Sequence, residues 1–112
     1  MSDDILLHSR DARGVHTITL NHPKAFNALS EAMMAALGQA LDAVAADPAA
    51  RVLVLAANGK AFCAGHDLKE MRGNHSKEFM QALFKQCGKL MLAITQMPQP
   101  VIARVHGIAT AA

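Results

Sequence analysis

The feature that most constrains the fold is an unbroken apolar run at residues 52–57, which reads VLVLAA. A run of this kind predicts a strand that is covered on both faces, as in a parallel sheet between helices. The segments before and after it show the apolar spacing of amphipathic helices. Strands that alternate with helices indicate an α/β fold in which at least some strands run parallel.

The first helix is predicted to begin at Ser30 and to end at Asp47. Ser30 is a good N-cap, and Glu31 places a negative charge where the helix dipole favours it. Apolar residues recur between these ends at Met34, Leu37, Leu41 and Val44. Such spacing predicts a buried helical face, in which methionine serves as core filler.

The second helix is predicted to begin near Asn74 or Ser76 and to end before Pro98. Its broad apolar stripe consists of Phe79, Met80, Leu83, Phe84, Cys87, Leu90, Met91 and Ile94. Two β-type runs, residues 5–8 and 15–20, flank a polar turn with a glycine and predict an N-terminal hairpin. Residues 100–107 form a further β-type run.

The composition favours a globular protein that forms a core. The 112 residues are enough for one domain, 52% of them are hydrophobic and 18% are charged. The net charge is only +2, and the aromatic residues are four Phe, with no Trp or Tyr. The chain therefore lacks the basic surface and the stacking aromatics of a nucleic-acid-binding protein, and we expect no nucleic-acid partner. No run approaches the roughly 20 apolar residues of a membrane span, so no membrane partner is expected.

The N-terminal residues Asp3 and Asp4 are acidic where a signal peptide would be basic, which predicts a cytoplasmic protein. Cys63 and Cys87 lie in apolar stretches without C-x-x-C spacing. They are predicted to be reduced, buried side chains, with a disulfide as the lesser alternative. The final segment 108–112 is apolar and has no cap or charge, so we expect the chain to be truncated within a larger fold.

The segment 61–71, which follows the predicted buried strand, holds the candidate site. Ligands of open α/β sheets bind at the carboxyl ends of the strands. Gly65 allows a positive φ and a close approach of a ligand to the backbone, and free amides there would bind an oxyanion or a phosphate. Taken alone, a glycine at this position is more often simple turn chemistry.

The residue types of this segment would also suit three other chemistries. His66, Asp67, Glu70 and His75 lack the fixed helical spacing of strong metal signatures, so no metal site is expected. His66 as a general base stays open, although nothing nearby in the sequence orients its imidazole. Cys63 as a nucleophile has no adjacent cation to lower its pKa.

Three motifs resemble those of the crotonase (enoyl-CoA hydratase/isomerase) family. Residues 21–30, NHPKAFNALS, are similar to its N-x-P-x-x-x-N-A-L loop. Residues 62–71, FCAGHDLKEM, resemble its F-x-x-G-x-D-[LI]-x-E-M segment, and residues 100–107, PVIARVHG, resemble its P-V-I-A-x-V-x-G strand. The three motifs also occur in the family's order and with its spacing, so the chain resembles the N-terminal portion of proteins of this family.

The resemblance implies an α/β fold, the N-terminal half of a crotonase-like ββα spiral, with residues 1–112 forming a partial acyl-CoA-binding domain. It also implies an acyl-CoA thioester as substrate and no separate cofactor, because coenzyme A is part of the substrate. The family commonly forms homo-oligomers, here a trimer or hexamer, and a fragment of this length would gain stability by assembling with copies of itself.

The resemblance also implies the site residues. The backbone amides of His66 and Ala112 would be the two oxyanion-hole donors that stabilise an enolate. The substrate pocket would be lined by Lys24, Ala25, Ala64, Gly65, Asp67 and Leu68, with Lys24 meeting a phosphate of coenzyme A. At residues 111–112 the chain has Ala-Ala where the family usually has Gly-Gly, which keeps the amides but changes the freedom of the backbone.

The family's acid and base carboxylates follow this turn and are not in the chain. Glu70 is the only acid near the loop, and we expect it to face solvent. The sequence therefore predicts an enoyl-CoA hydratase/isomerase-family protein whose 112-residue chain is inactive alone. The alternative is a non-catalytic acyl-CoA-binding or assembly module, and the residues beyond Ala112 discriminate between the two.

Overall fold

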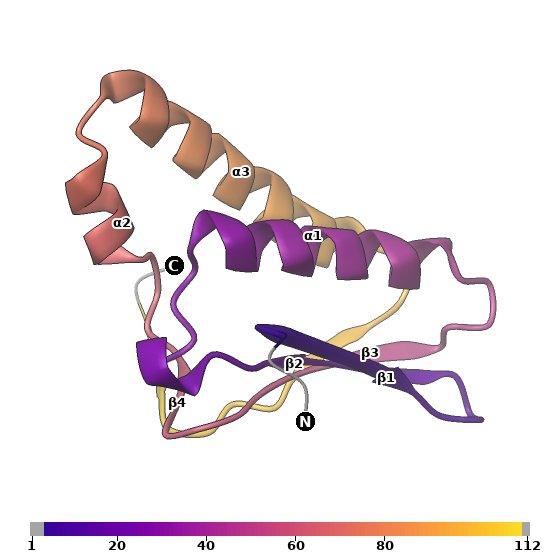
Figure 1. Cartoon of the computed structure of the whole chain (residues 1–112). Helices are drawn as coiled ribbons and strands as arrows, with labels where there is room; N and C mark the ends of the chain where they lie inside the picture. The colour runs from indigo at the N-terminus through magenta and orange to yellow at the C-terminus, as the bar shows by residue number, and fades with distance from the viewer. Residues whose placement is uncertain (1–3, 111–112) are drawn as a thin grey trace.

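The computed structural model of the chain describes residues 4–110, which form two layers. In chain order the elements are β1 (Leu6–Arg10), β2 (Val15–Leu20), the 3-10 helix η1 (Pro23–Ala25), α1 (Glu31–Ala46), β3 (Val52–Ala57), β4 (Ala61–Cys63), α2 (Leu68–Gly73), α3 (Lys77–Gln96), β5 (Val101–Ala103) and β6 (Ile108–Ala109). Helices α1 and α3 lie side by side over one face of the main sheet (Figure 1). The α/β arrangement predicted from the sequence is confirmed.

The main sheet has the strand order β1-β2-β3-β5. The β1–β2 hairpin is antiparallel, whereas β2 pairs with β3 and β3 with β5 in parallel. The register pairs Leu20 with Ala57, so β2 and β3 end at the same edge of the sheet. The loops that follow these two strands therefore start next to each other.

Both long helices begin where their caps were predicted. The Ser30 hydroxyl accepts a hydrogen bond from the Met33 amide at 3.1 Å, and the Ser76 hydroxyl accepts one from the Phe79 amide at 3.0 Å. Each bond satisfies an amide that has no partner within its own helix. Among the described residues no helix has the length and apolarity to cross a membrane.

The core lies between the helices and the facing side of the sheet. Its best-buried side chains include Ile18, Met33, Met34, Leu41, Val44 and Leu53. The two methionines confirm for α1 the prediction that methionine fills the core, whereas Met91 of α3 is 37% exposed. Cys63 and Cys87 are buried and free, as expected.

The apolar stripe predicted for α3 is wider than the face that the helix buries. Leu83, Cys87 and Leu90 are buried, whereas Phe84 and Met91 are 50% and 37% exposed. Periodicity marks apolar residues on one side of a helix, but the width of the neighbouring layer decides how many of them lose contact with water.

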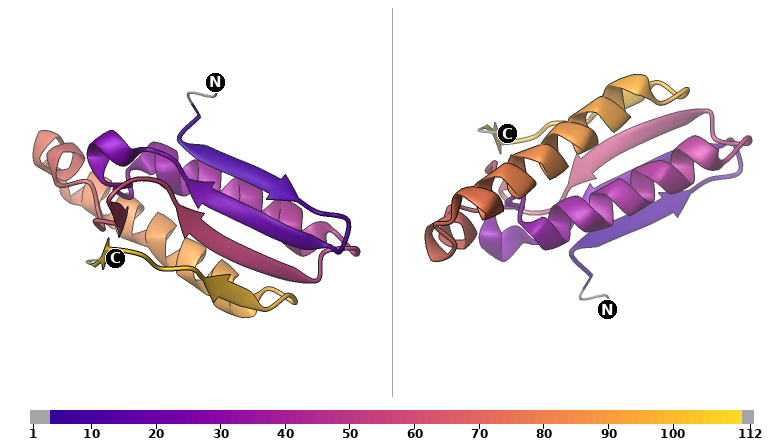
Figure 2. Two further views of the ribbon diagram at one scale, coloured as in Figure 1. Left: turned by 90° about the horizontal axis from the view of Figure 1, so that it is seen from below. Right: turned by 90° about the horizontal axis from the view of Figure 1, so that it is seen from above.

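The prediction that β3 is buried on both faces is wrong for the described residues. Leu53 is fully buried beneath the helices. On the opposite face of the strand Ala56 is also buried, but Val52 and Val54 are only half-buried. Figure 2 shows the reason: both long helices cover the same side of the sheet, and the strands are in full view from the other side.

The β-type run at residues 100–107 forms a shorter strand than expected, because β5 ends at Ala103. The chain then crosses to the β3–β4 turn, where the His106 side chain donates from Nε2 to the Gly59 carbonyl at 2.6 Å. Gly107 forms a bridge with Ala61 at a φ of 63°, and a Cβ there would collide with the Lys60 carbonyl oxygen. Glycine is therefore required at this crossing.

We predict that Gly107→Ala lowers the free energy of unfolding by roughly 2 kcal/mol or more, because the new Cβ meets backbone and the left-handed φ is strained. Urea denaturation measures the change. Gly88→Ala is the matched control: its Cβ has open space within α3, and we expect a gain of about 0.5–1 kcal/mol. Equal effects of the two substitutions would contradict the close crossing at Gly107.

A histidine pair ties the hairpin to the end of α1. Buried His16 lies between His8 and Asp47, with ring nitrogens 2.8 Å from His8 Nε2 and 3.0 Å from Asp47 Oδ2. Burial, together with the nearby His16, lowers the pKa of His8 below its ordinary value of 6.5. The amide of Ala49, followed by the His16 side chain, lowers the pKa of Asp47.

We predict that His8 makes the protein less stable as the pH falls through about 6.5. The unfolded chain protonates His8 at a higher pH than the folded chain does, so this part of the stability is present above 6.5 and is lost toward the lowered folded pKa. His8→Gln should flatten the fall in unfolding free energy between pH 7.5 and 5.5, measured by urea denaturation. His75→Gln, in the exposed α2–α3 connection, should keep the wild-type slope. A wild-type slope in His8→Gln would refute the prediction.

Candidate functional site

Two loops meet at the edge where β2 and β3 end. Residues 21–30 follow β2, and residues 58–67 follow β3 and include β4. The Ala64 amide donates to the Phe26 carbonyl at 3.0 Å, and the Leu29 amide donates to the Gly65 carbonyl at 2.7 Å. These bonds bring together the segments in which the predicted site residues lie.

Gly65 forms the turn of the second loop. It is buried, its φ is 86°, and its amide donates to the Cys63 sulfur at 3.4 Å. The positive φ is one that residues with a Cβ rarely adopt, so the sequence prediction for this glycine is confirmed at the level of the backbone.

The backbone of His66 lies at the junction of the two loops, in a bridge with Leu29. Within residues 4–110 no protein group accepts a hydrogen bond from this amide. The imidazole packs edge-on against Phe84, with ring centroids 5.4 Å apart, and its buried Nδ1 has no hydrogen-bond partner among the described residues. In the described part of the chain, no carboxylate orients this nitrogen as a general base would require, so the geometry favours a role for the backbone.

The carboxylates near His66 are engaged in capping helices. Asp67 is the N-cap of α2, and its Oδ1 accepts hydrogen bonds from the Lys69 and Glu70 amides, both at 3.1 Å. Glu70, which we expected to face solvent, is half-buried instead, and its Oε1 accepts from the Glu31 amide at 2.9 Å. The reason is that the free amides at the start of α1 attract a carboxylate.

The remaining predicted binding residues lie at the rim. Lys24 is exposed and Ala25 is half-buried, both within η1. Ala64 is half-buried, and Leu68, the first residue of α2, is 72% exposed. Ala112, the second predicted oxyanion donor, lies outside the described residues.

The end of the described chain runs beside β4. Strand β6 pairs with β4 in parallel, with Ala109 opposite Cys63, and the Thr110 amide donates to the Cys63 carbonyl at 3.1 Å. The segment that leads to Ala112 therefore lies next to the strand that leads to His66.

An apolar cavity of about 290 Å³ lies behind these strands. Its walls come from β2, β3, β4, β6 and the loops and helices around them, and include Leu29, Phe62, Cys63, Met91, Ile94 and Thr110. Burial raises the pKa of the Cys63 thiol, which disfavours the thiolate that a nucleophile requires. The cavity is therefore suited to an apolar group rather than to covalent chemistry.

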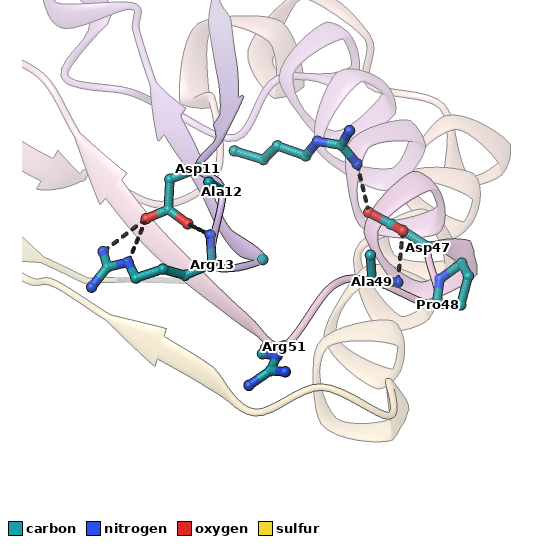
Figure 3. Close-up of a pocket in the computed structure, with 9 residues that line it drawn as sticks. Asp11, Ala12, Arg13, Asp47, Pro48, Ala49 and Arg51 are labelled. Carbon is teal, nitrogen blue, oxygen red and sulfur yellow. Dashed lines mark hydrogen bonds and ion pairs between the residues drawn. The ribbon is translucent and has the colours of Figure 1, made fainter.

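A larger hollow of about 790 Å³ lies at the opposite end of the sheet, between the β1–β2 turn and the α1–β3 connection (Figure 3). It contains Arg10, Arg13 and Arg51. Arg13 pairs with Asp11 at 2.7 Å and lowers the pKa of that carboxyl, and Arg10 pairs with Asp47 at 3.3 Å. Exposed ion pairs of this kind contribute little to the stability of the fold. The hollow is also separate from the two loops that hold the candidate site.

Sequence reasoning assigned no role to Asn27, which the structure places at the centre of the loop contact. Its side chain is fully buried and bonds to three backbone groups. Asn27 also has a φ of 55°, a conformation that asparagine adopts more readily than most residues. The sequence did hold a signal for this role, because Asn27 is the second Asn of the motif at residues 21–30.

Known proteins resemble this chain in both sequence and fold. A family model for enoyl-CoA hydratase/isomerase matches residues 10–112. A crystal structure of an enoyl-CoA hydratase from Mycobacterium smegmatis superposes on this chain with a TM-score of 0.94 and a sequence identity of 63%. The superposition covers 96% of this chain and 42% of the hydratase chain. The β-β-α order and the paired loops define a crotonase-type α/β protein.

The chain belongs to the enoyl-CoA hydratase/isomerase family. Curated relatives include enoyl-CoA hydratase domain-containing protein 3 of Xenopus laevis, a mitochondrial protein, which is 41% identical over 88% of this chain. Another is 1,2-epoxyphenylacetyl-CoA isomerase of Escherichia coli, which is 32% identical over the whole chain. The chain spans only 34% and 43% of these two proteins and corresponds to the N-terminal portion of the family fold.

We predict that Asp67→Ala loosens the start of α2, because two amides lose their cap at a cost of about 1 kcal/mol. Hydrogen exchange at the Lys69 and Glu70 amides should become several-fold faster. Ser76→Ala, which removes the cap of α3, should leave exchange at these two amides unchanged. Unaltered exchange in Asp67→Ala would show that the cap does not hold this turn.

Proposed function

We propose that the protein acts on acyl-CoA thioesters and that this chain supplies the oxyanion hole and the pocket, with the backbone amides of His66 and Ala112 as donors. The observation that carries the proposal is the His66 amide at the junction of the two loops, for which residues 4–110 provide no hydrogen-bond acceptor. The apolar cavity, which Leu29 and Cys63 line, and the path of Thr110 along Cys63 support the same arrangement.

In the proposed reaction the thioester oxygen accepts hydrogen bonds from both amides. When a proton leaves the carbon next to the carbonyl, or a nucleophile adds to an enoyl group, negative charge moves onto this oxygen and both bonds strengthen. One donor of this kind contributes about 3 kcal/mol to the stability of the transition state. The donors hold the charge but transfer no proton.

The rest of the pocket would recognise the substrate. The apolar cavity would hold the acyl chain, and exposed Lys24 would meet a phosphate of coenzyme A. Glu70 is unsuited to proton transfer because its carboxylate caps α1. We propose that the proton-transfer carboxylates follow Ala112 in the full-length protein, as the family resemblance implies.

The proposal concerns hydratase or isomerase chemistry rather than a non-catalytic module. The Mycobacterium smegmatis structure is named as an enoyl-CoA hydratase and the Escherichia coli relative as an isomerase, which favours an enzyme. Coenzyme A would enter as part of the substrate, with no separate cofactor. Assembly into a trimer or hexamer and a cytoplasmic location stay predictions.

The test of the donor is a pair of substitutions at His66. His66→Pro removes the amide hydrogen, whereas His66→Ala removes only the imidazole. We predict that His66→Pro weakens binding of acetoacetyl-CoA at least about tenfold, a change of about 1.4 kcal/mol, and that His66→Ala leaves it within about twofold. Titration calorimetry measures both, with circular dichroism to verify folding. Equal losses in the two variants would contradict a backbone donor.

Catalysis is tested separately with crotonyl-CoA. The 112-residue chain should not hydrate it, whereas the full-length gene product should. Hydration by the chain alone would show that the acid–base residues do not lie downstream.

A further inference from the structure

Asn27 has the surroundings of a structural clamp. Its side chain is 0% exposed, and its Oδ1 accepts a hydrogen bond from the His22 amide at 2.7 Å. Its Nδ2 donates to the Asn58 carbonyl at 2.9 Å and to the Ala61 carbonyl at 3.0 Å. Both hydrogens of the amide are used, so the carboxamide joins the loop after β2 to the loop after β3.

The backbone around Asn27 continues this connection. Phe26 and Asn27 both have left-handed φ values, 52° and 55°. On either side of this turn, the Phe26 carbonyl accepts from the Ala64 amide and the Leu29 amide donates to the Gly65 carbonyl. The side chain of Asn27 thus holds residues 58 and 61, and its flanking backbone holds residues 64 and 65.

The bond from Leu29 acts directly on the proposed oxyanion donor. The Gly65 carbonyl and the His66 amide belong to the same peptide group, and the described chain contains no cis peptide bond. In a planar trans peptide the C=O and N–H bonds point in opposite directions. When the Leu29 amide holds the Gly65 oxygen at 2.7 Å, it therefore also sets the direction of the His66 N–H.

We propose that Asn27 is the positioning residue of the oxyanion site: through the turn at residues 26–29 it holds the Gly65–His66 peptide so that the His66 amide faces the thioester. This inference rests on the proposed function. Asn27 is buried beneath the loops and acts through Leu29 and Gly65, so it is not itself a catalytic residue. Its loss should disturb recognition of the thioester oxygen more than recognition of coenzyme A.

The variant is Asn27→Gly, which keeps the left-handed φ without strain and removes the carboxamide together with its Cβ. The matched control is Gln99→Leu. Gln99 is also a buried amide, and its Nε2 donates to the Val44 carbonyl at 3.1 Å, away from the two loops. If Asn27→Gly does not fold, Asn27→Ser takes its place, because a hydroxyl replaces part of the hydrogen bonding but cannot donate to both carbonyls.

The first measurement is a ratio, the dissociation constant of coenzyme A divided by that of acetoacetyl-CoA. A loss of folded protein weakens both equally and leaves the ratio unchanged. We expect the ratio to fall about tenfold in Asn27→Gly and to stay at the wild-type value in Gln99→Leu. A wild-type ratio in Asn27→Gly would overturn the positioning role.

The second measurement needs no ligand. The NMR order parameter of the His66 amide should be about 0.85 in the wild-type chain and in Gln99→Leu, and below about 0.6 in Asn27→Gly. An unchanged order parameter would overturn the inference. If the wild-type chain itself does not prefer acetoacetyl-CoA to coenzyme A, the proposed function fails, and the order parameter still decides whether Asn27 positions His66.

Discussion

The parallel pairing of β2 with β3 is the constraint on which the site depends. Because Leu20 lies opposite Ala57, two loops that are about forty residues apart in the sequence begin at one edge of the sheet. Hydrogen bonds from Leu29 to Gly65 and from Ala64 to Phe26 then join them. Without this register, the His66 amide would have no fixed direction.

The crossing of the chain at Gly107 adds the third side of the site. The absence of a Cβ lets the backbone pass close to Lys60, after which β6 pairs with β4. The apolar cavity lies beside this pairing. The proposed oxyanion site needs donors that are already in place and surroundings with little water, and in the proposal the joined loops and the apolar cavity provide these two conditions.

Much of the fold was predictable because its signals are local. Ser30 and Ser76 cap the helices that follow them, and the spacing of Leu37, Leu41 and Val44 marks a buried face. The incomplete burial of Val54, the early end of β5 and the short β4–β6 sheet were not predictable in this way. They depend on which side of the sheet the helices cover and where the chain crosses.

The sequence by itself determined the family, through three motifs, and the glycine that the turn before His66 requires. Only the tertiary structure decided that the His66 amide has no acceptor within residues 4–110, that Glu70 caps α1 instead of facing solvent, and that Asn27 joins the two loops. The physical reason is that these properties belong to pairs of groups. A hydrogen bond exists only when chain segments distant in sequence are brought within about 3 Å, and no single segment encodes that distance.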